Sequence, residues 1–165
     1  MERKELLDGK KVYFEIEIPA QDLSVYLPKR TMEDMGVRLA MSRSRLPRVL
    51  DKLRSQPRIL PNDYKERQEE IWEQLRTGLV MQLAEAVRDL AWHKEREHLT
   101  KKDTQYLAQG KSRLAAEMAI VSGEELSDME TLIDDTLSAA VSRRATRERR
   151  HQHLAELTEL PNRGR

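Results

Sequence analysis

The chain has 165 residues and a formal net charge of +1; 36% of its residues are charged and 4% are aromatic. This composition is typical of a polar, mostly helical protein, because Glu, Lys, Arg, Gln, Leu and Ala are good helix formers. The absence of cysteine excludes a disulfide framework, a thiolate zinc site and a cysteine nucleophile.

The first elements predicted along the chain are short β-strands within residues 2–28. Residues 12–18 alternate between apolar and polar side chains, which is the period of a half-buried strand. Asp8-Gly9 favours a hairpin turn before this strand, and residues 19–22 favour a turn before the next one. The shared apolar face contains Phe14, Ile16, Ile18, Leu23, Val25 and Leu27. The pattern predicts a three-stranded meander, which has little core of its own.

After a connector over residues 29–42, the apolar spacing becomes helical. Five amphipathic helices are predicted over residues 43–142, which is enough chain for an independent bundle. Asn62 or Asp63 is the expected N-cap of the second helix, and Thr100 that of the fourth. The expected apolar stripes contain Leu46, Val49, Leu50 and Leu53; Tyr64, Ile71, Trp72 and Leu75; Leu79, Leu83, Val87, Leu90 and Ala91; Tyr106, Leu107, Leu114 and Met118; and Met129, Leu132, Ile133, Leu137 and Ala140.

The fifth helix is expected to start with a capping box, in which Ser127 and Glu130 satisfy each other's backbone N–H groups. The chain becomes basic after it, with seven Arg and three Glu in residues 143–165. This tail has no apolar face to bury. We expect it to extend the fifth helix, then to fray, and to contact nucleic-acid phosphates non-specifically.

Sequence motifs of catalytic, metal and membrane-spanning proteins are missing. The glycines form no phosphate-binding loop, and no Ser lies in a nucleophile elbow. His93 and His98 are five residues apart, which does not place two metal ligands on one helix face. No segment has the roughly 20 apolar residues of a transmembrane helix, and the N-terminus does not lead into a secretory signal. The sequence therefore predicts no enzyme, cofactor, small-molecule substrate or membrane partner.

Two features favour a binding protein instead. The edge of the small sheet carries unpaired backbone groups that can recruit a strand from a partner. The start of the second helix combines the aromatic ring of Tyr64 with the basic side chains of Lys65 and Arg67, beside backbone N–H groups that favour phosphate. A purely structural role is the alternative for each feature.

Several ordered segments resemble the CarD (also called CdnL) family of bacterial transcription regulators. The resemblance extends over residues 2–140. It is strongest at residues 83–90, Leu-Ala-Glu-Ala-Val-Arg-Asp-Leu, and continues through residues 114–119 and 133–137. It implies a Tudor-like β-domain that binds the β subunit of RNA polymerase. It also implies a helical domain that approaches promoter DNA at the upstream edge of the melted bubble.

The resemblance also implies roles for residues of the β-domain. Two basic polymerase contacts of the family fall on Lys4, which is basic here, and on Tyr26, which is not. Val25 and Leu27 flank Tyr26 in the expected edge strand and complete the implied polymerase-binding set.

In the helical domain, an aromatic residue of the family, usually Trp, wedges into the minor groove and favours the open complex. Its position falls on Tyr64, with Lys65 and Arg67 as the neighbouring basic candidates. Glu66 and Glu69 make this helix more acidic than the family pattern.

The resulting prediction is an α+β, mostly α protein. It comprises a truncated Tudor-like β-meander at residues 1–28, a linker at 29–42, a five-helix DNA-facing domain at 43–142 and a basic tail at 143–165. The family's first strands have no counterpart before Met1, so either the protein is short or its start is misassigned. The expected function is a cytoplasmic, nucleoid-associated regulator that binds polymerase and stabilises the open complex. The alternative is a divergent adaptor that binds polymerase or DNA without activating.

Overall fold

The computed structural model describes residues 13–18, 23–28 and 38–158, with side chains described as far as Arg150. The chain divides into two compact units, Met1–Leu39 and Ala40–Arg165. The first unit contains the strands and the second contains the helices, and each is described by itself.

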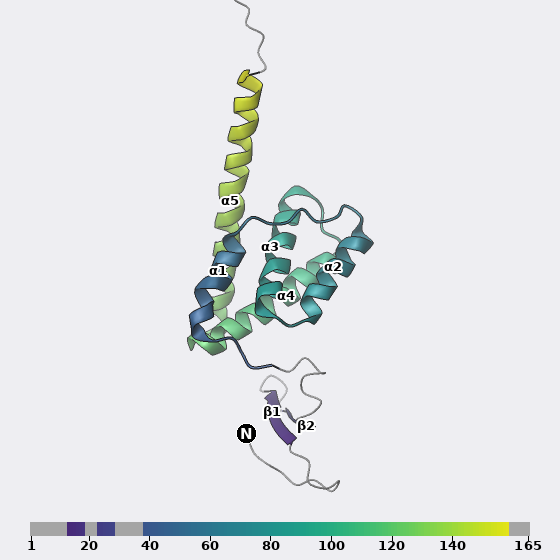
Figure 1. The fold of residues 1–165 in the computed structure, drawn as a ribbon, viewed down its shortest axis with the longest axis vertical. Coiled ribbons are helices and arrows are strands. Elements are labelled where there is room, and N and C mark those ends of the chain that lie inside the picture. The colour runs from purple at the N-terminus through teal and green to yellow at the C-terminus, as the bar shows by residue number, and fades with distance from the viewer. Residues whose placement is uncertain (1–12, 19–22, 29–37, 159–165) are drawn as a thin grey trace, which may run out of the picture. The chain divides into compact units, whose positions relative to one another are not determined.

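The first unit contains an antiparallel pair of strands, β1 (Tyr13–Ile18) and β2 (Leu23–Pro28) (Figure 1). Phe14 lies opposite Leu27, and Ile16 lies opposite Val25. The side chains expected to share the apolar face are therefore cross-strand neighbours, as the period-2 pattern predicts. The second and third strands of the predicted meander correspond to β1 and β2, whereas its first strand and the Asp8-Gly9 turn lie outside the described residues.

In the second unit, a short 3-10 turn, η3 (Arg43–Arg45), leads into the helices. These are α1 (Leu46–Arg54), α2 (Tyr64–Arg76), α3 (Val80–Arg96), α4 (Lys101–Ser122) and α5 (Leu126–Thr158). Five α-helices after a small sheet, in the part of the chain that the structure describes, confirm the predicted fold class. None of these helices is long and apolar enough to cross a membrane.

The central helix of the bundle is α3, which packs against α1, α2, α4 and α5. One side of α3, with Val80, Ala84 and Val87, joins a core formed with α1, α4 and α5. Another side, with Leu83, Ala86 and Leu90, joins a second core formed with α2 and α4. A helix that is apolar on most of its surface is buried by its neighbours, and α3 therefore holds the two cores together.

A close approach of α4 to α3 occurs at Gly110. A Cβ atom at this position would lie 2.8 Å from Cγ2 of Val87 and 3.3 Å from Cδ2 of Leu75. Only a residue without a side chain allows the helices to approach this closely without a shift of the buried side chains.

Three residues assigned to apolar stripes are instead about half exposed: Tyr64 (49%), Trp72 (47%) and Leu79 (48%). The core side of α2 is formed by Ile71 and Leu75, which are fully buried. Trp72 follows Ile71 directly, and consecutive helical residues point about 100° apart. With Ile71 and Leu75 facing the core, Trp72 therefore points away from it. Leu79 precedes the first turn of α3 as its N-cap residue.

The expected capping box of the fifth helix is wrong. The helix begins at Leu126, so Ser127 lies inside its first turn. The backbone N–H groups of Asp128 and Met129 donate to the carbonyl oxygen of Glu125 at 3.2 Å. The first turn is therefore closed by backbone hydrogen bonds rather than by the side chain of Ser127.

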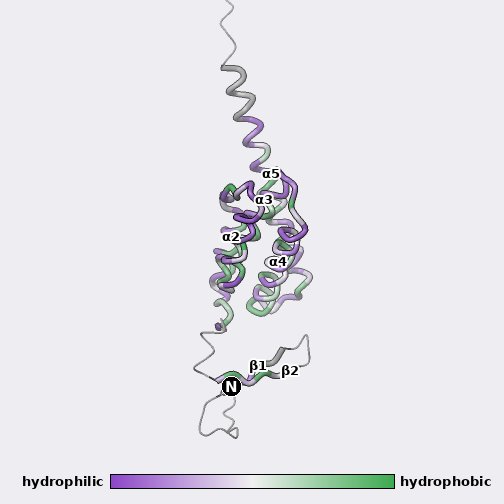
Figure 2. Tube along the Cα trace, turned by 90° about the vertical axis from the view of Figure 1, so that its right-hand side faces the viewer, coloured by the Kyte–Doolittle hydropathy of each residue, from purple (hydrophilic) through white to green (hydrophobic). Residues whose placement is uncertain are grey.

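Helix α5 has 33 residues and continues past Arg143 without a break. It extends beyond the other helices of its unit (Figure 1), and those of its projecting turns that carry a hydropathy colour in Figure 2 are mostly hydrophilic. The predicted extension of the fifth helix is confirmed.

Candidate nucleic-acid interface

The segment that leads into α2 is fixed on the central helix by an Arg-Asp pair. Asp89 is almost fully buried, and its Oδ1 accepts from the backbone N–H of Arg58 at 2.9 Å and from Nε of Arg88 at 2.7 Å. Nη1 of Arg88 also donates to Oγ of Ser55 at 2.7 Å. The loop after α1 is therefore attached to α3 at two points, which determines where α2 begins.

The start of α2 is capped by Asp63, one of the two N-cap residues that the sequence predicts. Oδ1 of Asp63 accepts from the backbone N–H groups of Lys65 at 2.9 Å and Glu66 at 3.0 Å. These hydrogen bonds, that from Glu66 above all, lower the pKa of the Asp63 carboxyl below its ordinary value. The carboxylate is thus charged at neutral pH and stabilises the end of the helix where backbone N–H groups are free.

Arg67 lies in this first turn but points into the protein. Its side chain is buried, and Nη1 donates to the carbonyl oxygens of Pro61 at 2.8 Å and Asn62 at 3.1 Å. Nη2 forms an ion pair with Oδ2 of Asp103 at 2.8 Å. The structure therefore places Arg67 differently from the expected phosphate contact. It is a positioning residue, and it ties the start of α2 to the start of α4.

Asp103 is the acidic partner of Arg67 in this ion pair. It belongs to a capping box of α4, in which Oγ1 of Thr100 accepts from the backbone N–H of Asp103 and Oδ2 of Asp103 accepts from that of Thr100. Burial alone would raise the pKa of Asp103, but the hydrogen bonds from Arg67 and Thr100 outweigh it and lower that pKa. Burial, and then the charge of Arg67, lower the pKa of the nearby His93. At neutral pH the pair is charged and His93 is neutral.

Tyr64 and Lys65, unlike Arg67, face outward. Tyr64 is the first residue of α2, and its ring is half exposed. Lys65 is exposed and lines a shallow groove between α2 and α4. An aromatic ring and an ammonium group therefore lie on the outer side of a helix start, which the buried Arg67 ties to α4.

The groove is lined by an aromatic pair, in which Trp72 is half exposed and Tyr106 is partly buried against the core of α2, α3 and α4. The sequence interpretation assigned both rings to the core. The ring centroids of Trp72 and Tyr106 are 6.2 Å apart, with an angle of 25° between the ring planes. Nζ of Lys102 lies 5.6 Å from the centroid of the Tyr106 ring. Stacked rings beside Lys65 and Lys102 form a surface suited to nucleic acid. The neighbouring apolar residues Ile71 and Trp72, which cannot both face one core, were the available signal.

The other predicted site residues belong to the first unit. Val25, Tyr26 and Leu27 lie in β2 and are half-buried. The hydroxyl of Tyr26 donates to Oε1 of Glu15, on the facing strand, at 2.6 Å. Lys4 lies outside the described residues. In the described part of the chain, no group of three or more His, Asp or Glu side chains is arranged to hold a metal ion.

The fold and this interface define a helical domain with a candidate nucleic-acid-binding surface. The family model of the CarD C-terminal domain matches residues 48–134, from α1 into α5. This match covers more than half of the chain, and the chain therefore belongs to the CarD family. The family consists of non-enzymatic transcription factors, and RNA polymerase is the partner that membership implies in general terms.

Proposed function

We propose that this protein binds the β subunit of RNA polymerase through its strand unit and stabilises the promoter open complex through a minor-groove contact at the start of α2. The contact is made by Tyr64 and Lys65. This role requires no catalytic group, cofactor or small-molecule substrate, and it places the protein on the nucleoid in the cytoplasm.

The observation that carries the proposal is the half-exposed ring of Tyr64 at a helix start that is held from three sides. Asp63 caps the helix, Arg67 ties it to α4, and the preceding loop is attached to Asp89. A rigidly held aromatic ring can insert at a base step and oppose its re-stacking, which is worth a few kcal/mol. A ring on a mobile loop would lose much of that gain to ordering entropy.

The polymerase contact is assigned to β2 and to Lys4. Strand addition at a sheet edge is made by main-chain hydrogen bonds, so a Tyr at position 26 does not abolish it. Val25 and Leu27 are two residues apart, so their side chains lie on the same face of the sheet beside the added strand. The Tudor-like character of this unit remains a prediction.

The second candidate is an adaptor that binds polymerase or DNA without stabilising the open complex. It is favoured by the internal ion pair of Arg67, which removes one of three expected DNA-contacting residues from the surface. Glu66 and Glu69 lie exposed on the same helix and oppose phosphate binding. Lys65 is then the main source of attraction at the start of α2.

The lifetime of the open complex on a promoter separates these functions. Tyr64→Ala should shorten the lifetime, while co-purification with RNA polymerase and the melting temperature stay close to those of the wild type. Ile120→Ala is a matched control, because Ile120 is a large apolar residue, 75% exposed, on α4. An unchanged lifetime for Tyr64→Ala, with polymerase binding retained, would favour the adaptor. Failure of the wild type to co-purify with polymerase would exclude the proposed function and leave only an adaptor that binds DNA.

A further inference from the structure

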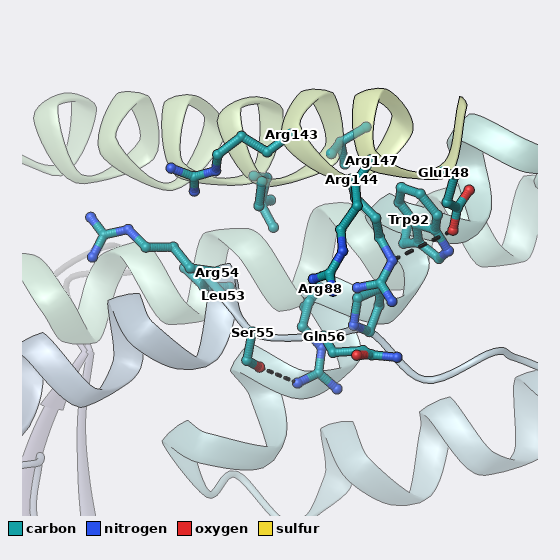
Figure 3. Close-up of a pocket in the computed structure, with 14 residues that line it drawn as sticks. Leu53, Arg54, Ser55, Gln56, Arg88, Trp92, Arg143, Arg144, Arg147 and Glu148 are labelled. Atoms are coloured by element: carbon teal, nitrogen blue, oxygen red, sulfur yellow. Dashed lines mark hydrogen bonds and ion pairs between the residues drawn. The ribbon is translucent and has the colours of Figure 1, made fainter. Parts of the chain in front are cut away.

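An arginine-rich cavity of about 470 Å³ lies between the end of α1, the middle of α3 and the projecting part of α5 (Figure 3). Its charged lining residues are Arg54, Arg88, Arg143, Arg144, Arg147 and Glu148. Among the lining residues, five guanidinium groups thus meet a single carboxylate. The volume falls within the range of roughly 300–1,000 Å³ that small-molecule sites occupy.

Arg88 is the most buried arginine of the cavity, and two side chains fix its position. The side chain of Arg88 is only 10% exposed, and it donates to Asp89 and to Ser55, each at 2.7 Å. Arg88 therefore forms a fixed base for the cavity. Its charge is balanced by Asp89, and its guanidinium lies beside Ser55 at the end of α1 (Figure 3).

The arginines around the opening are bound loosely. Nε of Arg144 lies 3.7 Å from Oε1 of Glu148, and Nη1 of Arg54 lies 3.5 Å from Oδ1 of Asp51. Arg143 and Arg147 are exposed, and neither has an ion pair or a hydrogen bond with the side chains that the structure describes. These two lie one helical turn apart, where like charges destabilise a helix. A bound anion would remove this repulsion.

The aromatic ring of the cavity is already covered. The guanidinium carbon of Arg144 lies 5.2 Å from the centroid of the Trp92 ring, and that of Arg96 lies 6.0 Å from it. Trp92 is only 6% exposed. A planar base has no free ring face to stack on, so recognition in this cavity depends on anionic groups.

We infer that this cavity binds a soluble anion with at least two phosphate groups, of the class of inorganic pyrophosphate and nucleoside polyphosphates. Guanidinium groups bind phosphate oxygens in bidentate pairs, and arginines from three helices are too many for one phosphate group. The recess favours a small anion over duplex DNA, whose convex backbone reaches Arg143 and Arg147 but not the buried Arg88. This site is separate from the proposed contacts with polymerase and the promoter.

The test is a titration of the full chain with sodium pyrophosphate, followed by calorimetry and by tryptophan fluorescence. Trp72→Phe leaves Trp92 as the only tryptophan, so the signal reports on the ring that Arg144 covers. Pyrophosphate should bind at least about tenfold more tightly than inorganic phosphate. Arg143→Gln with Arg147→Gln should weaken pyrophosphate binding by about tenfold or more.

The matched control is Arg149→Gln with Arg150→Gln. It removes the same charge from exposed positions of the same helix that do not line the cavity, and it should change the affinity less than about twofold. Equal losses in the two double variants, equal affinities for phosphate and pyrophosphate, or no change in Trp92 fluorescence would overturn the inference. Displacement of pyrophosphate by duplex DNA, with the same sensitivity to Arg143 and Arg147, would assign the cavity to the DNA backbone instead.

Discussion

Arg67 and Asp103 form a buried ion pair, with Nη2 of the arginine 2.8 Å from Oδ2 of the aspartate. The pair joins the first turns of α2 and α4, which are separated in the sequence by the whole of α3. Both side chains are at most 4% exposed. The orientation of the candidate DNA contact at Tyr64 therefore depends on a charge pair that the solvent does not reach.

Removal of one partner of this pair should be strongly destabilising. Arg67→Ala leaves the carboxylate of Asp103 charged, buried and unpaired, and we expect a loss of about 3–5 kcal/mol in the free energy of unfolding. Chemical denaturation measures this loss. Arg76→Ala is the control, because it breaks an ion pair of similar length with Glu73 that is exposed and worth about 0–1 kcal/mol. Similar losses in the two variants would show that the buried pair is not essential.

The buried His93 should make stability depend on pH. Its pKa in the folded protein lies below the ordinary 6.5, so the unfolded chain binds a proton first as the pH falls. Stability should therefore decrease on acidification from about pH 7 to pH 5, and His93→Gln should remove this slope. His98→Gln, at an exposed position, should retain it. A slope that survives in His93→Gln would assign it to another group.

Asp103 contributes in a different pH range. Its pKa is lowered below 3.8, so its stabilising effect is present above that value and is lost only as the pH falls through the lower pKa of the folded state. The effect of His93 between pH 7 and pH 5 can therefore be measured without protonating Asp103 in its ion pair with Arg67.

A methyl group at Gly110 should destabilise the bundle. Alanine has the higher helix propensity by about 1 kcal/mol, but its Cβ would meet Cγ2 of Val87 at 2.8 Å. We expect Gly110→Ala to cost about 1–3 kcal/mol in net stability, because a buried β-branched side chain must move. Gln109→Ala, an exposed position on the same helix, should be close to neutral. A higher melting temperature for Gly110→Ala would mean that the helices separate easily.

A larger ring at the start of α2 should strengthen the proposed DNA contact. Tyr64→Trp offers more stacking surface and removes a hydroxyl that prefers water or a hydrogen-bond partner. The lifetime of the open complex should lengthen, while polymerase binding and the melting temperature stay near those of the wild type. Ile120→Trp, which adds an indole ring at an exposed site of α4 outside this surface, is the control and should leave the lifetime unchanged. A lifetime that Tyr64→Trp leaves unchanged or shortens would argue against a wedge at this position.

Features that depend on neighbouring residues were predictable from the sequence. The caps at Asp63 and Thr100 lie within three residues of the N–H groups they bind. Gly123 ends α4 with a φ of 76°, a conformation that glycine adopts without strain. The facing apolar residues of β1 and β2 follow from the period of a strand. The segment at residues 83–90 carried the family resemblance, and the family match over residues 48–134 includes it.

The tertiary structure decided which charged and aromatic residues face the solvent. Arg67 looked like a phosphate ligand because it follows Tyr64 and Lys65, but its partner Asp103 is 36 residues away. Trp72 looked like a core residue, yet Ile71 occupies the buried row. The arginine cavity brings together α1, α3 and α5, and no local pattern predicts that Arg88 and Arg147 share it. Local spacing determines where a helix starts and which of its sides is apolar. Whether a long charged side chain is buried or faces the solvent depends on partners from distant segments of the chain.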